Sequence, residues 1–265
     1  MNDEITHFVY CYKNPEGKEF NRYDLMFSLM SIRRYYKDSY DITIIGELPD
    51  YIDIESSDIN FIPFNMRREN GNTQSNIFRS ILEICKIYER FVSIDDDMIF
   101  LKNAYKKDIE KLYHEGEYKE ENGKFIDFGD SYQDALSCTK KLLNVEKMYI
   151  LDTHIPIFIN SQTMLDMVKN LNVEKLLEED TPLIFRELYR NYNIKLLLKM
   201  FPTEISTNFK ISFGRWEDKD NLEKLLSENY EWKMLNTSEE AYFYKPILMD
   251  FLRWKFNIQG FKCTL

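Results

Sequence analysis

Two kinds of apolar spacing alternate along the N-terminal part of the chain. Short β-rich or apolar runs, typical of strands, occupy residues 6–12, 41–46, 59–64 and 90–94. Residues 23–36 and 73–88 instead place apolar side chains mostly three or four positions apart, which gives a helix one buried face. Because a strand, a helix and a second strand form a parallel βαβ unit, the recurrence of this order predicts a doubly wound α/β sheet.

Length and composition fit a single globular domain. The chain has 265 residues, of which 44% are hydrophobic, so apolar side chains suffice to offset the entropy of the unfolded chain. No stretch rich in Pro, Gly or Ser marks a domain boundary. The 45 acidic residues outnumber the 35 basic ones, and a net charge of -10 repels a polyphosphate backbone. The charge therefore disfavours DNA or RNA as the main partner.

Cysteine usage and hydropathy predict a cytoplasmic protein. The four cysteines are far apart, and none lies in a C-x-x-C pair of the kind that binds zinc or acts in redox chemistry. Residues 2–4 are polar, and the longest apolar runs are well short of the ~20 residues that cross a bilayer. We therefore expect free thiols in a reducing compartment and no transmembrane segment.

Three consecutive aspartates, Asp95, Asp96 and Asp97, follow the apolar run 91–94 and precede the apolar run 98–101. This is the carboxyl end of a predicted strand, where doubly wound sheets bind their ligands. Adjacent carboxylates repel one another at low dielectric unless a cation or a proton compensates them. Mg2+ and Mn2+ prefer oxygen ligands and bridge protein carboxylates to substrate phosphates. The triplet predicts a divalent metal site; the alternative is a solvated Asp-rich turn or cap.

The side chains of the three aspartates are also expected to point in different directions. In an extended segment alternate side chains point the same way, so Asp95 and Asp97 are expected to share one side and Asp96 to face the other. We therefore assign Asp97 and Asp95 to the metal, with Asp95 also contacting the ribose of a nucleotide.

Several segments, in this order along the chain, resemble GT-A glycosyltransferases, particularly small bacterial and phage-borne ones with an Asp-x-Asp motif. The segments are Phe8–Tyr12, Leu29–Ile32, Ile44–Pro49, Asn76–Arg79 and Phe91–Met98. The resemblance covers about the first 165 residues. It implies a Rossmann-like, mostly parallel or mixed sheet flanked by helices, with a mainly helical C-terminal part. It also implies one catalytic domain, with a nucleotide-sugar-binding half at 1–105, an acceptor-side half at 106–200 and a C-terminal packing segment at 201–265.

The same resemblance implies a reaction. In GT-A enzymes the Asp-x-Asp motif binds Mn2+ or Mg2+ together with the diphosphate of a nucleotide sugar, so Asp95 and Asp97 take these roles here. Asp96 joins them as a nucleotide-sugar contact, and the roles of the three acids are not separable from sequence. The implied activity is transfer from a nucleotide sugar, with a UDP-sugar as the favoured donor, to a hydroxyl of a glycan or surface polysaccharide.

Further nucleotide contacts are expected from side chains near the same sheet edge. Arg79 precedes the triplet on a helix and suits a bidentate phosphate contact, or it is a solvated helix charge. Tyr10 and Tyr12 end the first strand and either stack on the base or pack in the core, and Asn14 follows them. In the run 210–216, Arg215 lies beside Gly214 and Trp216, where it either closes over the donor phosphates or flanks a packing tryptophan.

A second polar cluster interrupts the hydrophobic run 149–159, where Asp152, Thr153 and His154 precede Pro156. Polar atoms inside such a run need a reason. The segment resembles the acceptor-side His-x-Pro element of the same enzymes and of Stealth-type sugar-phosphate transferases. His154 is accordingly a candidate acceptor contact, third metal ligand or general base, with Asp152 as a second candidate for the acceptor. The alternative is a histidine satisfied within the core or a turn.

The rest of the chain predicts packing elements. Residues 118–129 are polar and turn-rich and favour a surface hairpin over a mobile acceptor loop. Helices are expected at 164–177 and 182–192. A C-terminal helix within 242–262 should bury four apolar side chains: Leu248, Phe251, Leu252 and Phe256.

Three other function classes share some of these features. A Mg2+-dependent phosphotransfer enzyme or sugar-phosphate transferase also uses clustered carboxylates, but the chain has no G-x-x-x-x-G-K-[ST] phosphate loop. A phage-type DNA-modifying glycosyltransferase fits the motif but not the net charge of -10. A noncatalytic nucleotide-sugar-binding module would bind the donor without turnover. The sequence does not indicate an oligomeric state.

Overall fold

In the computed structural model, ten stretches of the chain are described, and they divide between two compact units. The described stretches are residues 5–14, 23–55, 57–66, 73–121, 124–125, 130–151, 153–179, 181–213, 219–237 and 245–258. Unit 1 comprises Met1–Lys13, Asp38–Ile94 and Lys106–Ser206. Unit 2 comprises Asn14–Lys37, Asp95–Tyr105 and Thr207–Leu265.

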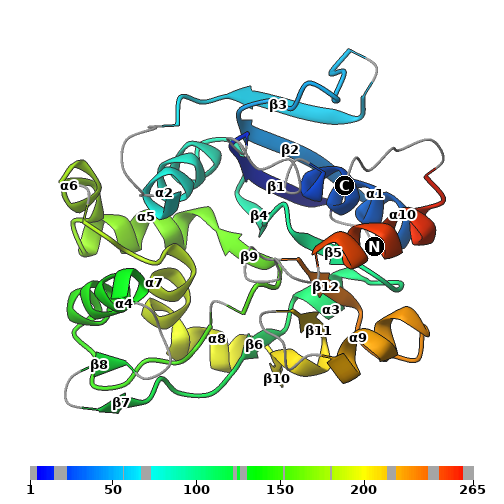
Figure 1. Ribbon diagram of the computed structural model, residues 1–265. Coiled ribbons are helices and arrows are strands. Elements are labelled where there is room, and N and C mark those ends of the chain that lie inside the picture. Colours follow the sequence, from blue (N-terminus) through cyan, green and yellow to red (C-terminus); the bar gives the residue numbers. More distant parts are fainter. Residues whose placement is uncertain are drawn as a thin grey trace. The chain divides into compact units, whose positions relative to one another are not determined.

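Unit 1 is built on a five-stranded sheet, whose strands lie in the order β3-β2-β1-β4-β9 (Figure 1). These are β3 (Ile59–Pro63), β2 (Tyr40–Gly46), β1 (Thr6–Tyr12), β4 (Arg90–Ile94) and β9 (Ile157–Asn160). The first four strands are parallel to their neighbours, whereas β9 is antiparallel to β4. The mostly parallel α/β sheet expected from the sequence is therefore confirmed, and the predicted bounds of β1 and β4 hold to the residue.

The helices of unit 1 lie between the strands of this sheet along the chain and after its last strand, β9. They are α2 (Thr73–Ile84), α3 (Lys106–Ile109), α4 (Asp130–Leu143), α5 (Ser161–Asn170), α6 (Val173–Glu178), α7 (Phe185–Tyr192) and α8 (Ile194–Met200). The single helix predicted at 164–177 is wrong: Asn172 takes a left-handed φ of 52° and separates α5 from α6. Asparagine tolerates this conformation better than most residues, which explains the break.

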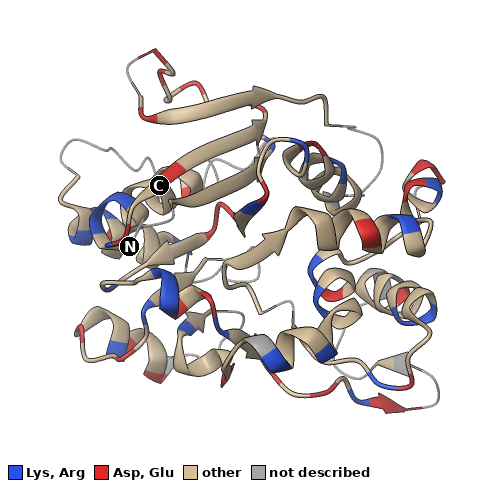
Figure 2. Cartoon of the chain, turned by 180° about the vertical axis from the view of Figure 1, so that it is seen from behind, with Lys and Arg blue, Asp and Glu red and all other residues tan. Residues whose placement is uncertain are grey.

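Two short strand pairs complete unit 1. The strands β6 (Leu112–His114) and β10 (Thr203–Ile205) pair in parallel, and β7 (Glu120–Glu121) and β8 (Lys124–Phe125) form an antiparallel pair. The second pair agrees with the hairpin favoured for residues 118–129. Basic and acidic residues both occur along α4, α5 and α6 (Figure 2).

Gly46 ends β2 at a close approach of two strands. Its φ is +124°, and a Cβ at this position would lie 2.2 Å from the carbonyl oxygen of Tyr12 and 2.6 Å from Cε of Met66. Residues with a side chain rarely adopt this φ, and the Tyr12 backbone is fixed by its pairing with β2. The position therefore requires glycine.

We expect Gly46→Ala to lower the free energy of unfolding by about 2 kcal/mol or more, because it adds a clash with backbone to the strain of the positive φ. Gly116→Ala is the matched control: Gly116 has a φ of +98° and no atom within 4 Å of the added Cβ. The free energy of unfolding of this control should fall by only about 1 kcal/mol, which is the cost of a positive φ for a residue with a Cβ. Urea denaturation of both variants measures the difference, and equal losses would contradict the clash.

Among its described residues, unit 2 combines three helices with a three-stranded sheet of order β11-β12-β5. The helices are α1 (Asp24–Tyr35), α9 (Lys219–Leu226) and α10 (Lys245–Phe256), and the strands are β5 (Met98–Phe100), β11 (Lys210–Ser212) and β12 (Met234–Asn236). The 3-10 turn η2 (Ser206–Asn208) connects β10 to β11 along the chain. β12 is parallel to β11 and antiparallel to β5. The sequence predicted no strands at β11 and β12, since three residues are too few for a recognisable alternation.

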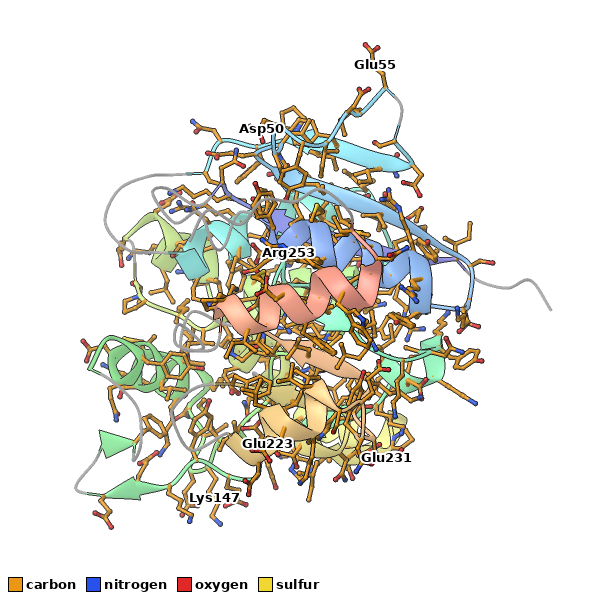
Figure 3. The ribbon with its side chains drawn as sticks, turned by 45° about the vertical axis from the view of Figure 1, so that its right-hand side comes forward. Asp50, Glu55, Lys147, Glu223, Glu231 and Arg253 are labelled. Atoms are coloured by element: carbon orange, nitrogen blue, oxygen red, sulfur yellow. The ribbon has the colours of Figure 1, made fainter. Side chains whose placement is uncertain are left out.

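The outer helices of unit 2 cover an apolar core. Figure 3 marks α10 by Arg253 and α9 by Glu223. The four side chains of α10 predicted to point inward are all buried: Leu248, Phe251, Leu252 and Phe256. They pack with Ile99, Ile211 and Leu235, one from each strand of the sheet. Within the described part of the chain, no helix has the length and apolar character needed to cross a bilayer.

Candidate functional site

The aspartate triplet connects β4 to β5 through a tight turn. The amide of Met98 donates to the carbonyl of Asp95 at 3.2 Å. Asp95–Asp97 therefore form a turn, whereas the argument from alternating side chains assumed an extended segment. A carboxylate oxygen of Asp95 nevertheless lies within 4.8 Å of one of Asp97. The two acids expected to share one side are therefore brought together, but by a turn rather than by strand alternation.

Neighbouring elements of unit 2 fix this turn. The amide of Thr237, directly after β12, donates to the carbonyl of Asp97 at 3.0 Å. On the other side, Ser28 Oγ of α1 donates to the carbonyl of Met98 at 2.5 Å, and the amide of Phe100 donates to Ser31 Oγ at 2.9 Å. Both serines are fully buried. The backbone that carries the aspartates is thus held by α1 and by the end of β12.

A buried ion pair lies in the same unit. Lys245 Nζ, at the start of α10, is 2.5 Å from Asp24 Oδ2 and donates to the carbonyl of Thr237 at 2.7 Å. Thr237 Oγ1 donates to Asp24 Oδ1 at 3.3 Å. Asp24 and Lys245 are 4% and 3% exposed. Burial raises the pKa of Asp24 to about 7, although the ammonium of Lys245 opposes the rise.

This shift predicts a dependence of stability on pH. Because the folded-state pKa is about 7 and the ordinary value is 3.8, folded Asp24 retains its proton over a range in which unfolded Asp24 loses it. Its contribution to stability is present below pH 4 and is lost as the pH rises towards 7. We expect the free energy of unfolding, measured with a chelator present, to fall between pH 4 and pH 7 in the wild type. In Asp24→Asn it should fall less over the same range. Parallel profiles for the two proteins would contradict the assignment.

The neighbouring acidic side chains affect the ionisation of Asp96. Loss of surrounding water, followed by the charges of Asp97, Asp24 and Asp95, raises the pKa of Asp96 well above its usual range. Four carboxyl groups therefore crowd one region of unit 2, with Lys245 as their basic partner in a described ion pair. This excess of negative charge is the electrostatic setting in which a divalent cation binds.

The second predicted cluster lies in unit 1, just before β9. His154 is exposed and has a left-handed φ of 46°, while Thr153 and Ile155 on either side are buried. This conformation interrupts the extended run expected over 149–159, so the strand begins only at Ile157. Asp152, the other candidate in this cluster, lies outside the described residues.

No family model and no curated protein sequence matches this chain. Among solved structures it is similar to the apo form of WbbM, a bifunctional glycosyltransferase, with a TM-score of 0.50 and 12% identity. The fold is GT-A-like. The match covers 97% of this chain but 51% of the other, so the chain spans about half the length of that protein.

Within the GT-A-like fold, the remaining predicted nucleotide contacts have varied settings. Tyr10 and Tyr12 are each 1% exposed, as the core-packing interpretation requires, so their contact with a base stays a prediction. Asn14 is exposed. The guanidinium of Arg79 donates to the carbonyl of Leu177 near the end of α6, which the sequence did not indicate. Its phosphate role also stays a prediction.

Arg215 lies outside the described residues, so its proposed closure over the donor phosphates is untested. Sequence reasoning missed Asp24, Thr237 and Lys245, which surround the aspartate turn. Asp24 carried a weak signal, because it is an acid at the start of a helix whose other charged residues, Arg33 and Arg34, lie in its last turn. Lys245 lies 221 positions from Asp24, beyond the reach of any local pattern.

Proposed function

We propose that this chain is a metal-dependent glycosyltransferase, which moves a sugar from a nucleoside diphosphate sugar to an acceptor hydroxyl. The observation that carries the proposal is the Asp95–Asp97 pair, with carboxylate oxygens within 4.8 Å, directly after β4 in a GT-A-like fold. In open α/β sheets, ligands bind beyond the carboxyl ends of the parallel strands. A nucleotide sugar supplies the phosphates that a carboxylate-bound cation needs to complete its coordination.

The residues present fit Mn2+ or Mg2+. Carboxylate oxygens are the ligands that these hard cations prefer, and the crowding of acids around Asp96 favours binding of positive charge. We propose Asp95 and Asp97 as the aspartate ligands and His154 of unit 1 as a third ligand. A bound cation would neutralise the charge that develops on the departing diphosphate.

The chain's own residues then have distinct tasks. Asp95 and Asp97 would hold the cation to which the donor diphosphate binds, and the hydrogen bond from Thr237 to the carbonyl of Asp97 keeps this turn in place. Asp96, Tyr10, Tyr12, Asn14, Arg79 and Arg215 remain the proposed contacts to the donor nucleotide, for which a UDP-sugar is favoured. His154 or Asp152 is proposed to contact the acceptor hydroxyl of a glycan or surface polysaccharide.

Calorimetric titration of UDP-, GDP-, CDP- and dTDP-sugars, each with Mn2+ and with a chelator, tests the donor site. We expect one nucleotide to bind at least about tenfold more tightly with Mn2+. Asp50→Asn, at an aspartate remote in sequence from the triplet, serves as a matched charge control and should leave this coupling unchanged. No binding of any nucleotide sugar in either condition would refute the proposal.

A second candidate is transfer of a sugar phosphate. The specific observation in its favour is the His154-x-Pro156 segment, whose exposed histidine has a strained backbone at the polar interruption before β9. Both reactions use a nucleotide sugar and a divalent cation, so donor binding alone does not separate them. The two differ in the bond that breaks, and hence in the nucleotide released.

A further inference from the structure

The segment that precedes His154 runs between two sets of hydrogen-bond partners within unit 1. On one side, the amide of Ile150 donates to the carbonyl of Gly116 at 2.9 Å, and the amide of Glu115 donates to the carbonyl of Ile150 at 3.0 Å. The other side has no neighbouring strand among the described elements. Its backbone groups instead meet polar side chains of α7.

Four side chains of α7 make these contacts. Asn191 Oδ1 accepts from the amide of Tyr149 at 2.9 Å, and Asn191 Nδ2 donates to the carbonyl of Tyr149 at 3.0 Å. The amide of Leu151 donates to Glu187 Oε1 at 2.9 Å. Arg190 Nη1 donates to the carbonyl of Leu151 at 2.9 Å. Beyond His154, Arg186 Nη1 donates to the carbonyl of Ile155 at 2.7 Å.

These four residues, Arg186, Glu187, Arg190 and Asn191, are each at most 5% exposed. Burying charged groups is expensive, and apolar side chains of similar volume commonly give equal or greater stability. Their burial is therefore better explained by the backbone segment that they hold in place than by a contribution to the stability of the core. Asn191 Nδ2 also donates to Glu187 Oε2 at 2.8 Å, so the helix face is itself ordered.

The segment needs such support because its conformation is unfavourable. His154 has a φ of 46°, which costs a non-glycine residue about 1–2 kcal/mol. The Oγ1 atom of Thr153 is buried without a hydrogen-bond partner among the described residues, a further cost of about 1–3 kcal/mol. Such strain persists only where the surroundings over-determine the backbone. The bonds from Arg190 and Arg186 fall on Leu151 and Ile155, on either side of the strained residues.

We propose that α7 is the positioning element of the proposed active site: through Arg186 and Arg190 it fixes the backbone on both sides of His154 and thereby sets the orientation of the imidazole. This inference rests on the proposed function in so far as His154 serves the cation or the acceptor. Arg186 is a positioning residue rather than a catalytic one, because it acts on His154 through the carbonyl of Ile155.

The test uses the imidazole signals of protein labelled at histidine, which has only three: His7, His114 and His154. His154→Gln identifies the third signal. Arg186→Met removes the donor to Ile155, and Arg186→Lys keeps a charge and a donor. We expect the His154 signal to shift or broaden in Arg186→Met and to move less in Arg186→Lys, while the His7 and His114 signals stay unchanged.

Asn193→Ala is the matched control. Asn193 Nδ2 donates to the carbonyl of Tyr189 at 2.8 Å, so this variant loses a buried hydrogen bond to the same helix and none of the described bonds to residues 149–151 and 153–155. It should lower the melting temperature and leave all three signals in place. An unchanged His154 signal in whichever Arg186 variant folds would overturn the proposal, and so would an equal shift in Asn193→Ala.

Kinetics separate this inference from the proposed function. If the chain transfers a sugar, Arg186→Met should lower kcat about tenfold or more while the donor KM changes less than about twofold. If the wild type transfers nothing, the proposed function fails, while the imidazole signals still decide whether α7 sets the orientation of His154.

Discussion

Asp97→Asn is expected to lower the rate of sugar transfer at saturating donor by about 100-fold and to weaken Mn2+ binding by about 10–100-fold. Asparagine has the same shape as aspartate and leaves the hydrogen bond from Thr237 to the carbonyl of residue 97 in place. It removes one of the two negative charges, those of Asp95 and Asp97, that are proposed to bind the cation. The loss should therefore appear in cation affinity and turnover, whereas the melting temperature measured with a chelator should not fall, because one of several crowded negative charges is removed.

Asp96→Asn is the control for this prediction. Asp96 is not one of the two proposed aspartate ligands, and burial followed by the charges of three neighbouring carboxyl groups raises its pKa well above its usual range. Asparagine keeps the shape of this side chain and removes no proposed ligand, so we expect Mn2+ affinity to change less than about threefold. Isothermal titration with Mn2+ measures both variants. Equal losses in the two would show that the cation is not held by the Asp95–Asp97 pair.

Lys245→Met is expected to lower the free energy of unfolding by about 3–5 kcal/mol. Removal of one partner leaves the other buried without compensation, and Asp24 is 4% exposed. The carbonyl of Thr237 also loses its 2.7 Å bond from Lys245. Urea denaturation at pH 9, above the pKa of about 7 that Asp24 has in the pair, measures this loss, and a chelator removes any contribution from a bound cation.

The double variant Asp24→Asn, Lys245→Met identifies the source of that loss. Without Lys245, most of the cost should come from the stranded carboxylate, so neutralising Asp24 should restore at least about half of the stability. Arg253→Met, which breaks the exposed pair with Asp250 on the same helix, should cost less than about 1 kcal/mol. Additive effects of the two buried substitutions would contradict a coupled pair.

The sequence predicted those features that depend on local spacing. The bounds of β1 and β4, and the place of the aspartates directly after β4, follow from apolar runs only a few residues long. The buried face of α10 follows from helical spacing in the same way. These elements pack as their own residues dictate, which is why a pattern within one segment is enough to find them.

Other features depend on contacts between distant segments. The spacing within residues 182–192 predicts a helix, but it does not predict that Arg186, Glu187 and Arg190 of α7 are buried against the segment before β9. Asp95 and Asp97 approach each other through a turn that the alternation of a strand does not describe. Neither the left-handed φ of His154 nor the ion pair of Asp24 with Lys245 leaves a local trace in the sequence.

The central claim is tested most directly by the nucleotide released during turnover. Phosphorus NMR should follow the nucleotide sugar that binds best, incubated with the protein, an acceptor glycan and Mn2+, beside a reaction with a chelator. Glycosyl transfer breaks the bond between the anomeric carbon and the oxygen of the diphosphate, so the account predicts release of nucleoside diphosphate that requires Mn2+. Release of nucleoside monophosphate, with the sugar phosphate joined to the acceptor, would contradict it and establish sugar-phosphate transfer instead.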